Sequence, residues 1–147
     1  MKAAALVLLL LASGAAHAVL GGDLASIQAD ALQVQGTRRA TAALDHTVHE
    51  IVAPDGARQR QYTNAQGRVF RVDWVQDGKP RLAALLGVHD AAYRAALQRA
   101  GRGSPLQRQV VVEAGDLVVQ QSAYLNRHAG SAWLRSQLPA SLAEQRR

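Results

Sequence analysis

Three neighbouring residues, Asp45, His46 and His49, have side chains that can bind a metal ion. Carboxylate and imidazole are common metal ligands, and two histidines three positions apart share a face only on a helix. The residues around them predict a β-strand over 47–53, in which His46 and His49 project to opposite faces. We therefore expect no metal site, an exposed His46, and a His49 that lies at a sheet edge or is partly packed.

Nucleophilic catalysis would need a serine beside a histidine and a carboxylate. Ser104 and Ser122 are candidate nucleophiles, but neither lies in a G-x-S-x-G segment, the strained turn that exposes such a hydroxyl. A hydrolase would therefore have to assemble only in three dimensions. It would place His49 or His128 in a cleft with a carboxylate and a hydroxyl within hydrogen-bond reach.

Paired carboxylates and thiols offer no clearer site. Two acids across a cleft can cleave glycosides, but the best pair, Glu50 and Asp73, falls opposite arginines and is expected to form cross-strand ion pairs. The chain has no cysteine, which excludes disulfides, cysteine-ligated zinc and thiol nucleophiles. We predict no catalytic residue, no cofactor and no metal, and regard an enzyme as the less favoured class.

One group of side chains suggests binding instead. Arg58, Arg60, Arg68 and Arg71, together with Tyr62, can form a face that binds an anion or a glycan. Guanidinium groups donate forked hydrogen bonds to carboxylate or phosphate, and the tyrosine ring offers a stacking surface. The two carboxylates named above partly neutralise this face, so a solvated sheet surface is the competing interpretation.

The elements that position these residues are predicted from hydrophobic periodicity and turn residues. Strands rich in β-branched and aromatic residues, separated by turn segments at 54–56 and 64–67, form an antiparallel meander. A second hairpin turns at 114–115. The predicted strands are 47–53, 58–63, 68–75, 107–113, 116–125 and 129–134, and the predicted helical regions are 23–35, capped by Asp23, and 81–100, broken or bent at Gly87.

Turn lengths set the register of the meander. A three-residue turn places Glu50 opposite Arg60, and a four-residue turn places Arg60 opposite Arg71 and Arg58 opposite Asp73. The predicted polar face reads Val48, Glu50, Val52, Arg58, Arg60, Tyr62, Val69, Arg71 and Asp73, and the predicted core face reads Ile51, Gln59, Gln61, Phe70, Val72 and Trp74. Segments 110–112 and 117–119 are apolar on both sides, which is typical of central strands, although at an edge they would invite strand addition.

The first eighteen residues predict export. Lys2 precedes an apolar stretch, and Ala16 and Ala18 form a small-x-small signal cleavage site before Val19. The expected mature chain is residues 19–147, with a flexible start at Gly21-Gly22 and no transmembrane segment. It is long enough for one domain with a packed core.

Charge narrows the expected partners. Lys2 is one of 17 basic residues, so the mature chain keeps 16 against 11 acidic residues, a net charge of +5. This charge favours anionic envelope components such as lipopolysaccharide, anionic lipid headgroups or acidic glycans. No dense basic stripe points to nucleic acid.

Four segments carry a resemblance to a known family. They are LGG at 20–22, TVHEI at 47–51, GRVFRVDW at 67–74 and GDLVVQ at 115–120. Together they resemble a family of small exported proteobacterial proteins, domain of unknown function 2844. The resemblance implies export and a single domain, and it implies no activity.

We therefore expect an α+β domain at 19–147, with an antiparallel sheet made of a three-stranded meander plus a C-terminal hairpin and with helices packed on one face. The favoured function is that of a non-enzymatic periplasmic or secreted protein that binds a partner protein or an anionic envelope component. The alternatives are an envelope hydrolase and an accessory subunit of a secretion or surface-assembly system. An uncovered edge in the hairpin at 110–125 would favour the accessory subunit.

Overall fold

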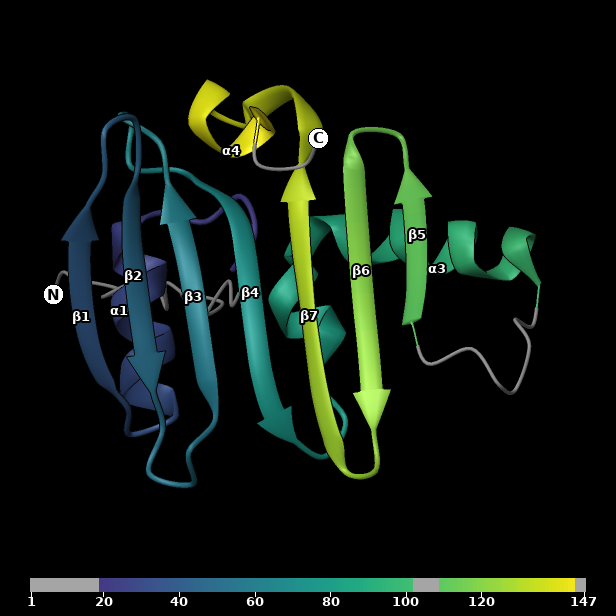
Figure 1. Cartoon of the computed structure of the whole chain (residues 1–147), viewed down its shortest axis with the longest axis horizontal. Helices are drawn as coiled ribbons and strands as arrows, with labels where there is room; N and C mark the ends of the chain where they lie inside the picture. Colours follow the sequence, from purple (N-terminus) through teal and green to yellow (C-terminus); the bar gives the residue numbers. More distant parts are fainter. Residues whose placement is uncertain (1–18, 102–108, 145–147) are drawn as a thin grey trace, which may run out of the picture.

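The computed structural model describes residues 19–101 and 109–144. Its centre is a seven-stranded antiparallel sheet in the order β1-β2-β3-β4-β7-β6-β5 (Figure 1). The strands are β1 (Thr37–Ala42), β2 (Thr47–Val52), β3 (Arg58–Thr63), β4 (Val69–Asp77), β5 (Gln109–Ala114), β6 (Leu117–Tyr124) and β7 (Arg127–Leu134). The predicted signal segment with Ala16 and Ala18, and the candidate nucleophile Ser104, lie outside the described residues.

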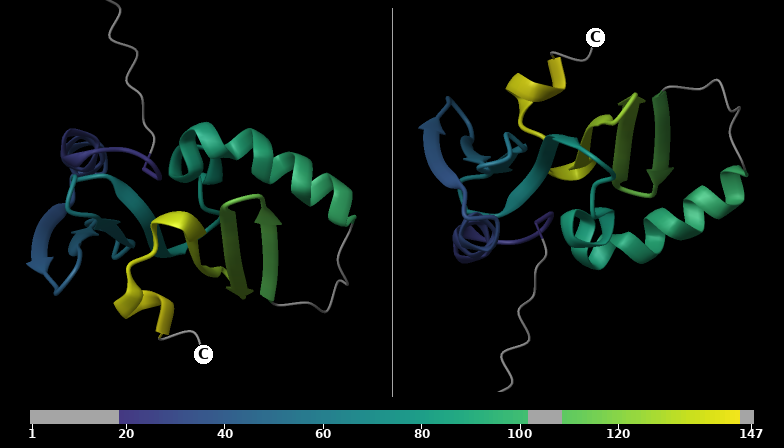
Figure 2. Two further views of the ribbon diagram at one scale, coloured as in Figure 1. Left: turned by 90° about the horizontal axis from the view of Figure 1, so that it is seen from above. Right: turned by 90° about the horizontal axis from the view of Figure 1, so that it is seen from below.

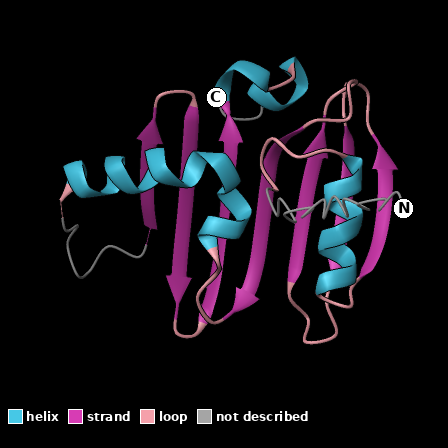
Figure 3. Ribbon diagram, turned by 180° about the vertical axis from the view of Figure 1, so that it is seen from behind, coloured by secondary structure: helices cyan, strands magenta, loops and turns pink. Residues whose placement is uncertain are grey.

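Helices cover one face of the sheet, which we call the inner face. They are α1 (Leu24–Gln33), α2 (Leu82–Leu86) and α3 (Asp90–Ala100), with a 3-10 turn at Gly87–His89 between the last two (Figure 3). A short fourth helix, α4 (Ala140–Glu144), lies on the opposite, outer face (Figure 2). The α+β class is as predicted, whereas the prediction that all helices share one face is wrong for α4.

Local sequence explains where these helices begin and end. The Asp23 carboxylate accepts the N–H of Ser26 at 3.0 Å and caps α1, as predicted. The Ser26 hydroxyl accepts the N–H of Asp23 in return, which completes a capping box. Gly87, with φ +53°, separates α2 from α3 because this backbone conformation favours glycine.

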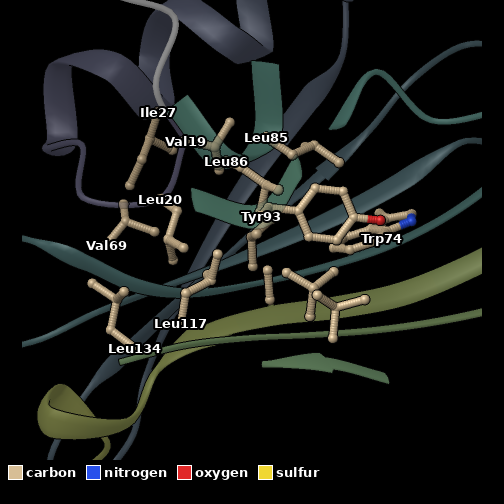
Figure 4. Packing of buried hydrophobic residues seen from close by; sticks show 14 of the residues in the cluster. Val19, Leu20, Ile27, Val69, Trp74, Leu85, Leu86, Tyr93, Leu117 and Leu134 are labelled. Carbon is tan, nitrogen blue, oxygen red and sulfur yellow. The ribbon is translucent and has the colours of Figure 1, made fainter. Parts of the chain in front are cut away.

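The core lies between the inner face and these helices, and Figure 4 shows its packing. Leu20 is fully buried in it, and its N–H donates to the carbonyl of Leu85 at 3.0 Å. The N–H of Gly21 donates to the carbonyl of Val69 at 2.8 Å, and the N–H of Val69 donates to the carbonyl of Gly22 at 2.9 Å. The expected flexible start of the mature chain is therefore wrong, since this segment is hydrogen-bonded to both β4 and α2.

The register of the meander is confirmed for β2 and β3, where Glu50 lies opposite Arg60. Between β3 and β4 the prediction is wrong, because a bulge at Tyr62/Thr63 shifts the pairing and brings Asp73, not Arg71, opposite Arg60. An extra residue in one strand reverses the facing of those beyond it. Val69 therefore joins the inner-face cluster, whereas Phe70, predicted for the core face, stacks near the outer-face Tyr62 at 6.3 Å between ring centroids.

Two edge strands differ from the sequence prediction. β1 was not predicted because Thr37–Ala42 has no apolar alternation, and all six of its residues are exposed. The meander and the C-terminal hairpin belong to one sheet, as predicted, and β7 lies between β4 and β6 and joins the two. β5 is the other edge and its Val111 is 55% exposed, which contradicts the central position expected for 110–112. The 117–119 segment of β6 is buried on both faces, as expected.

Candidate functional site

The outer face carries most of the predicted binding residues. Residues that lie opposite one another on adjacent strands form two rows across this face. The first row is Arg39, Glu50, Arg60, Asp73, Ser131, Gln120 and Val111, and the second is Thr37, Val52, Arg58, Val75, Ala129, Ser122 and Gln109. In the first row the charges therefore alternate in sign over β1–β4, and in both rows the residues of β7 and β6 are uncharged.

Two carboxylates hold part of this face in place. The Arg60 Nε donates to Glu50 Oε1 at 3.0 Å, and this bond raises the pKa of Arg60. Asp73 accepts two hydrogen bonds from Arg71, at 2.7 and 3.0 Å, and a third from the hydroxyl of Tyr62 at 2.8 Å. The Arg71 guanidinium also stacks 5.0 Å from the centre of the Tyr62 ring. Arg71 and Tyr62 are thus fixed by contacts within the protein.

Burial of the Tyr62 ring has an electrostatic consequence. Desolvation, followed by the negative charge of Asp73, raises the pKa of Tyr62 to about 12. Both effects disfavour the phenolate. At neutral pH the hydroxyl is therefore protonated and serves as a hydrogen-bond donor to Asp73.

A shallow groove follows the part of the two rows that lies over β3, β4, β7, β6 and β5. It consists of two depressions, with volumes of about 380 and 370 Å³, that share Arg60, Asp73, Trp74 and Val75. The first is lined further by Gly56, Arg58 and Arg127, and the second by Gln109, Gln120, Gln121, Ser122, Ala129, Gly130 and Ser131. We call this feature the basic groove, since three guanidinium groups lie at one end and amides and hydroxyls at the other.

The three groove arginines differ in how strongly they are held. Arg60 pairs with Glu50, and Arg127 pairs with Asp77 at 3.3 Å where both side chains are well exposed. Exposed pairs of this kind contribute little to stability and exchange easily. Arg58 is exposed and has no ion-pair partner within residues 19–101 and 109–144. Arg58 and Arg127 are therefore the groove cations most available to a ligand.

Four of the five residues predicted for the anion-binding face lie on the outer face: Arg58, Arg60, Tyr62 and Arg71. Arg68 does not, because it ends the β3–β4 turn, where its Nη1 lies 3.4 Å from the carbonyl oxygen of Gly21. Arg127 was missed because the last strand was predicted to begin two residues later, at Ala129. Extending that strand back by two residues would have placed Arg127 on the same face as Ala129, because side chains alternate between the two faces of a strand.

The two candidate metal-ligating histidines lie on opposite faces, as predicted, but neither is exposed. His49 is buried, with Nε2 3.1 Å from the Thr63 hydroxyl and Nδ1 3.5 Å from Arg38 Nη1. Burial, and then the charge of Arg38, lowers the pKa of His49. Only 8% of the His46 side chain is exposed, because its ring packs against Tyr62 and Phe70. The described residues contain no group of three or more potential metal ligands.

A serine, an aspartate and a histidine do meet on the outer face. Asp45 Oδ1 accepts from the Ser141 hydroxyl at 2.7 Å and lies 2.8 Å from His46 Nδ1. These bonds, that of His46 first, lower the pKa of Asp45. A catalytic triad needs the histidine between the serine and the carboxylate, whereas here the carboxylate lies between the other two. The arrangement therefore does not activate Ser141, and instead ties α4 to the β1–β2 turn.

The same C-terminal segment is tied to the β5–β6 turn. Asp116 accepts from the N–H and hydroxyl of Ser136, at 2.7 and 2.6 Å, and the hydroxyl bond is the main reason that its pKa is lowered. Phe70, Val118, Trp133 and Leu142 are buried outside the inner-face cluster. We call residues 135–144, which include Leu142, the C-terminal strap, since hydrogen bonds of Ser136 and Ser141 tie it to the two turns (Figure 2).

In the described part of the chain, no helix is both long and apolar enough to cross a membrane. No curated protein and no solved structure matches the chain in the comparisons with known proteins. The family model described as "Protein of unknown function (DUF2844)" matches residues 16–146, which is nearly the whole sequence. The chain therefore belongs to the DUF2844 family.

Proposed function

We propose that this chain is an exported, non-enzymatic binding protein that binds an anionic component of the cell envelope in the basic groove. The observation that carries the proposal is the groove itself, in which exposed Arg58 has no carboxylate partner among the described residues and lies beside Arg60 and Arg127. The net charge of +5 expected for the mature chain adds a long-range attraction of the same sign.

The chemistry of the groove fits a phosphate or carboxylate that is flanked by hydroxyl groups. Guanidinium groups bind such anions through two parallel hydrogen bonds. At the other end of the groove, the amide of Gln120 and the hydroxyls of Ser122 and Ser131 can exchange hydrogen bonds with ligand hydroxyls. Lipid headgroups and acidic glycans both have this combination.

The test compares two charge reversals in the mature chain, residues 19–147. Arg58→Glu places a negative charge in the groove, whereas Arg99→Glu makes the same change on α3, on the inner-face side. With lipopolysaccharide as the probe at low salt, we expect Arg58→Glu to weaken binding about tenfold, Arg99→Glu to change it less than twofold, and added salt to weaken the wild type. Equal effects of the two substitutions would refute a role for the groove.

A second candidate, the accessory subunit, is favoured by the edge strand β5. Val111 is exposed on this edge, and β5 contains no proline or lysine that would discourage pairing. β1, at the other edge, carries Arg38 and Arg39. A partner that adds a strand should be retained from envelope extract by the wild type and by Val88→Lys, an exposed control site, and lost with Val111→Lys.

The envelope-hydrolase alternative has no comparable support. His49 was a candidate base only if it met a carboxylate in a cleft, and it is instead buried between Thr63 and Arg38. Glu50 and Asp73 are both bonded to arginines, Glu50 across the strands as expected and Asp73 to Arg71 on its own strand.

A further inference from the structure

The turn between β6 and β7 lies at the lower end of the sheet in Figure 1, and two large side chains of this hairpin are exposed. Tyr124 is 63% exposed and Leu125 is 88% exposed. Tyr124 lies opposite Arg127, so the turn consists of Leu125 and Asn126 alone. We call Tyr124, Leu125 and Asn126 the hairpin tip.

Leu125 has a backbone conformation that is unfavourable for leucine. Its φ is +53°, and a two-residue hairpin turn with positive φ at its first position normally has glycine there. A buried leucine would compensate this strain through packing, but Leu125 is almost fully solvated. A strained residue that gains nothing within the described chain suggests that its side chain serves an interaction.

Cations surround the hairpin tip. Arg127 lies beside Tyr124 on the outer face, and the N–H of Gly78 donates to the carbonyl of Asn126 at 2.7 Å, which places exposed Lys79 next to the tip. Arg127 also lines the basic groove together with Arg58. Near the tip, Arg127 pairs with Asp77 and Lys79 is exposed. Together with Arg58 in the adjoining groove, these cations place positive charge beside the apolar tip.

We propose that the hairpin tip inserts into the interfacial region of an anionic lipid bilayer while Arg58, Lys79 and Arg127 bind its phosphate groups. The inference rests on the proposed function, since it identifies the anionic component as a lipid surface. Leucine gains from contact with acyl chains, and tyrosine prefers the boundary between acyl chains and headgroups. Basic residues are attracted to anionic lipids, and two weak signals together give stable binding where one does not.

A soluble acidic glycan would not need the hairpin tip. Such a ligand could lie along the basic groove and contact only arginines, amides and hydroxyls. The effect of Leu125 therefore distinguishes the two sources of anionic chemistry, whereas the effect of Arg58 does not.

The experiment measures co-sedimentation of the mature chain with vesicles of phosphatidylglycerol and phosphatidylethanolamine, compared with vesicles of phosphatidylcholine alone. The test variant is Leu125→Asn, because asparagine tolerates positive φ and the turn should fold at least as well. The matched control is Leu44→Asn, since Leu44 is 98% exposed in the β1–β2 turn at the opposite end. We expect binding only to the anionic vesicles, about tenfold weaker for Leu125→Asn and within twofold of wild type for Leu44→Asn.

Each other outcome has a defined meaning. If Arg58→Glu weakens vesicle binding but Leu125→Asn does not, the tip does not insert, and the proposed function still stands. If the wild type binds soluble alginate and not the anionic vesicles, the lipid inference is overturned and the groove retains an acidic glycan as its ligand. If it binds neither lipopolysaccharide, alginate nor vesicles, both proposals fail.

Discussion

Replacing Gly130 with alanine should destabilise the protein, because Gly130 is where the Trp74 ring lies directly on the backbone of β7. The two residues are paired across β4 and β7. A Cβ atom at position 130 would lie 2.7 Å from Trp74 Cε2 and 2.7 Å from the carbonyl oxygen of Gln120, with Trp74 Cζ2 closer still. Cβ contacts below 3.0 Å are essentially absent from real structures.

The loss of stability in Gly130→Ala depends on whether Trp74 or Gln120 can move away from the added methyl group. The two contacts at 2.7 Å fall 0.7 Å short of the 3.4 Å at which ordinary contact begins. The Trp74 ring is buried and the Gln120 oxygen belongs to the neighbouring strand, so neither is the free end of a flexible side chain. Overpacking of this kind costs about 1–3 kcal/mol, and we expect the upper end. Loss of chain entropy in the unfolded alanine variant returns about 0.4–1 kcal/mol, which leaves a net loss of about 2 kcal/mol.

The measurement is equilibrium unfolding in urea, followed by tryptophan fluorescence, with Ser131→Ala as the control. Ser131 is the next residue of β7 and faces the outer groove, so its substitution should change the free energy of unfolding by less than about 0.5 kcal/mol. A Gly130→Ala variant that is as stable as the wild type would show that Trp74 does not lie against β7 and would refute the reasoning.

Three further predictions concern the buried groups. The stability linked to the raised pKa of Tyr62 should be present below pH 10 and lost as pH rises toward about 12. Asp73→Asn should lower the pKa of Tyr62, which ultraviolet absorption of the phenolate measures. The stability linked to neutral His49 should be present above pH 6.5 and lost as pH falls below it, and His49→Gln should flatten this dependence in urea titrations. Leu142 is buried, so Leu142→Ala should lower the free energy of unfolding by about 2 kcal/mol. It should also increase amide hydrogen exchange in the C-terminal strap while the inner-face core stays protected. An equal increase in both regions would show that Leu142 does not stabilise the strap alone.

The parts of the fold with strong local signals were predicted from the sequence. The Pro54-Asp55-Gly56 turn gave the correct register of β2 and β3, because two short strands joined by a short turn have few alternative pairings. The α1 cap and the break at Gly87 also rest on neighbouring residues. Each of these features is decided within a few positions of the chain.

The rest depends on contacts between distant residues. The bulge at Tyr62/Thr63 leaves no mark in the alternation of Val69 and Phe70, so Phe70 was assigned to the inner face in place of Val69, although both side chains are buried. β1 pairs with β2 as its only neighbouring strand, and none of its side chains is buried. The 3.5 Å approach of Arg38 to His49, eleven positions away, likewise has no local signal.

The contrast among the outer-face arginines is the strongest support for the proposal that this face binds a ligand. Arg71 and Arg60 are hydrogen-bonded to carboxylates, and Arg71 also supports the Tyr62 ring, so these two are held by the sheet whether or not a ligand is present. Surface charge that served only solubility would not require Arg60 and Arg71 to be held in fixed positions by carboxylates. Arg58, two positions before Arg60 in β3, has no such partner among the described residues and lines the groove. Substitution of Arg71 should therefore lower stability, whereas substitution of Arg58 should lower binding and leave stability unchanged. If substitution of Arg58 and substitution of Arg71 changed stability and binding in the same way, the face would be an ordinary solvated surface.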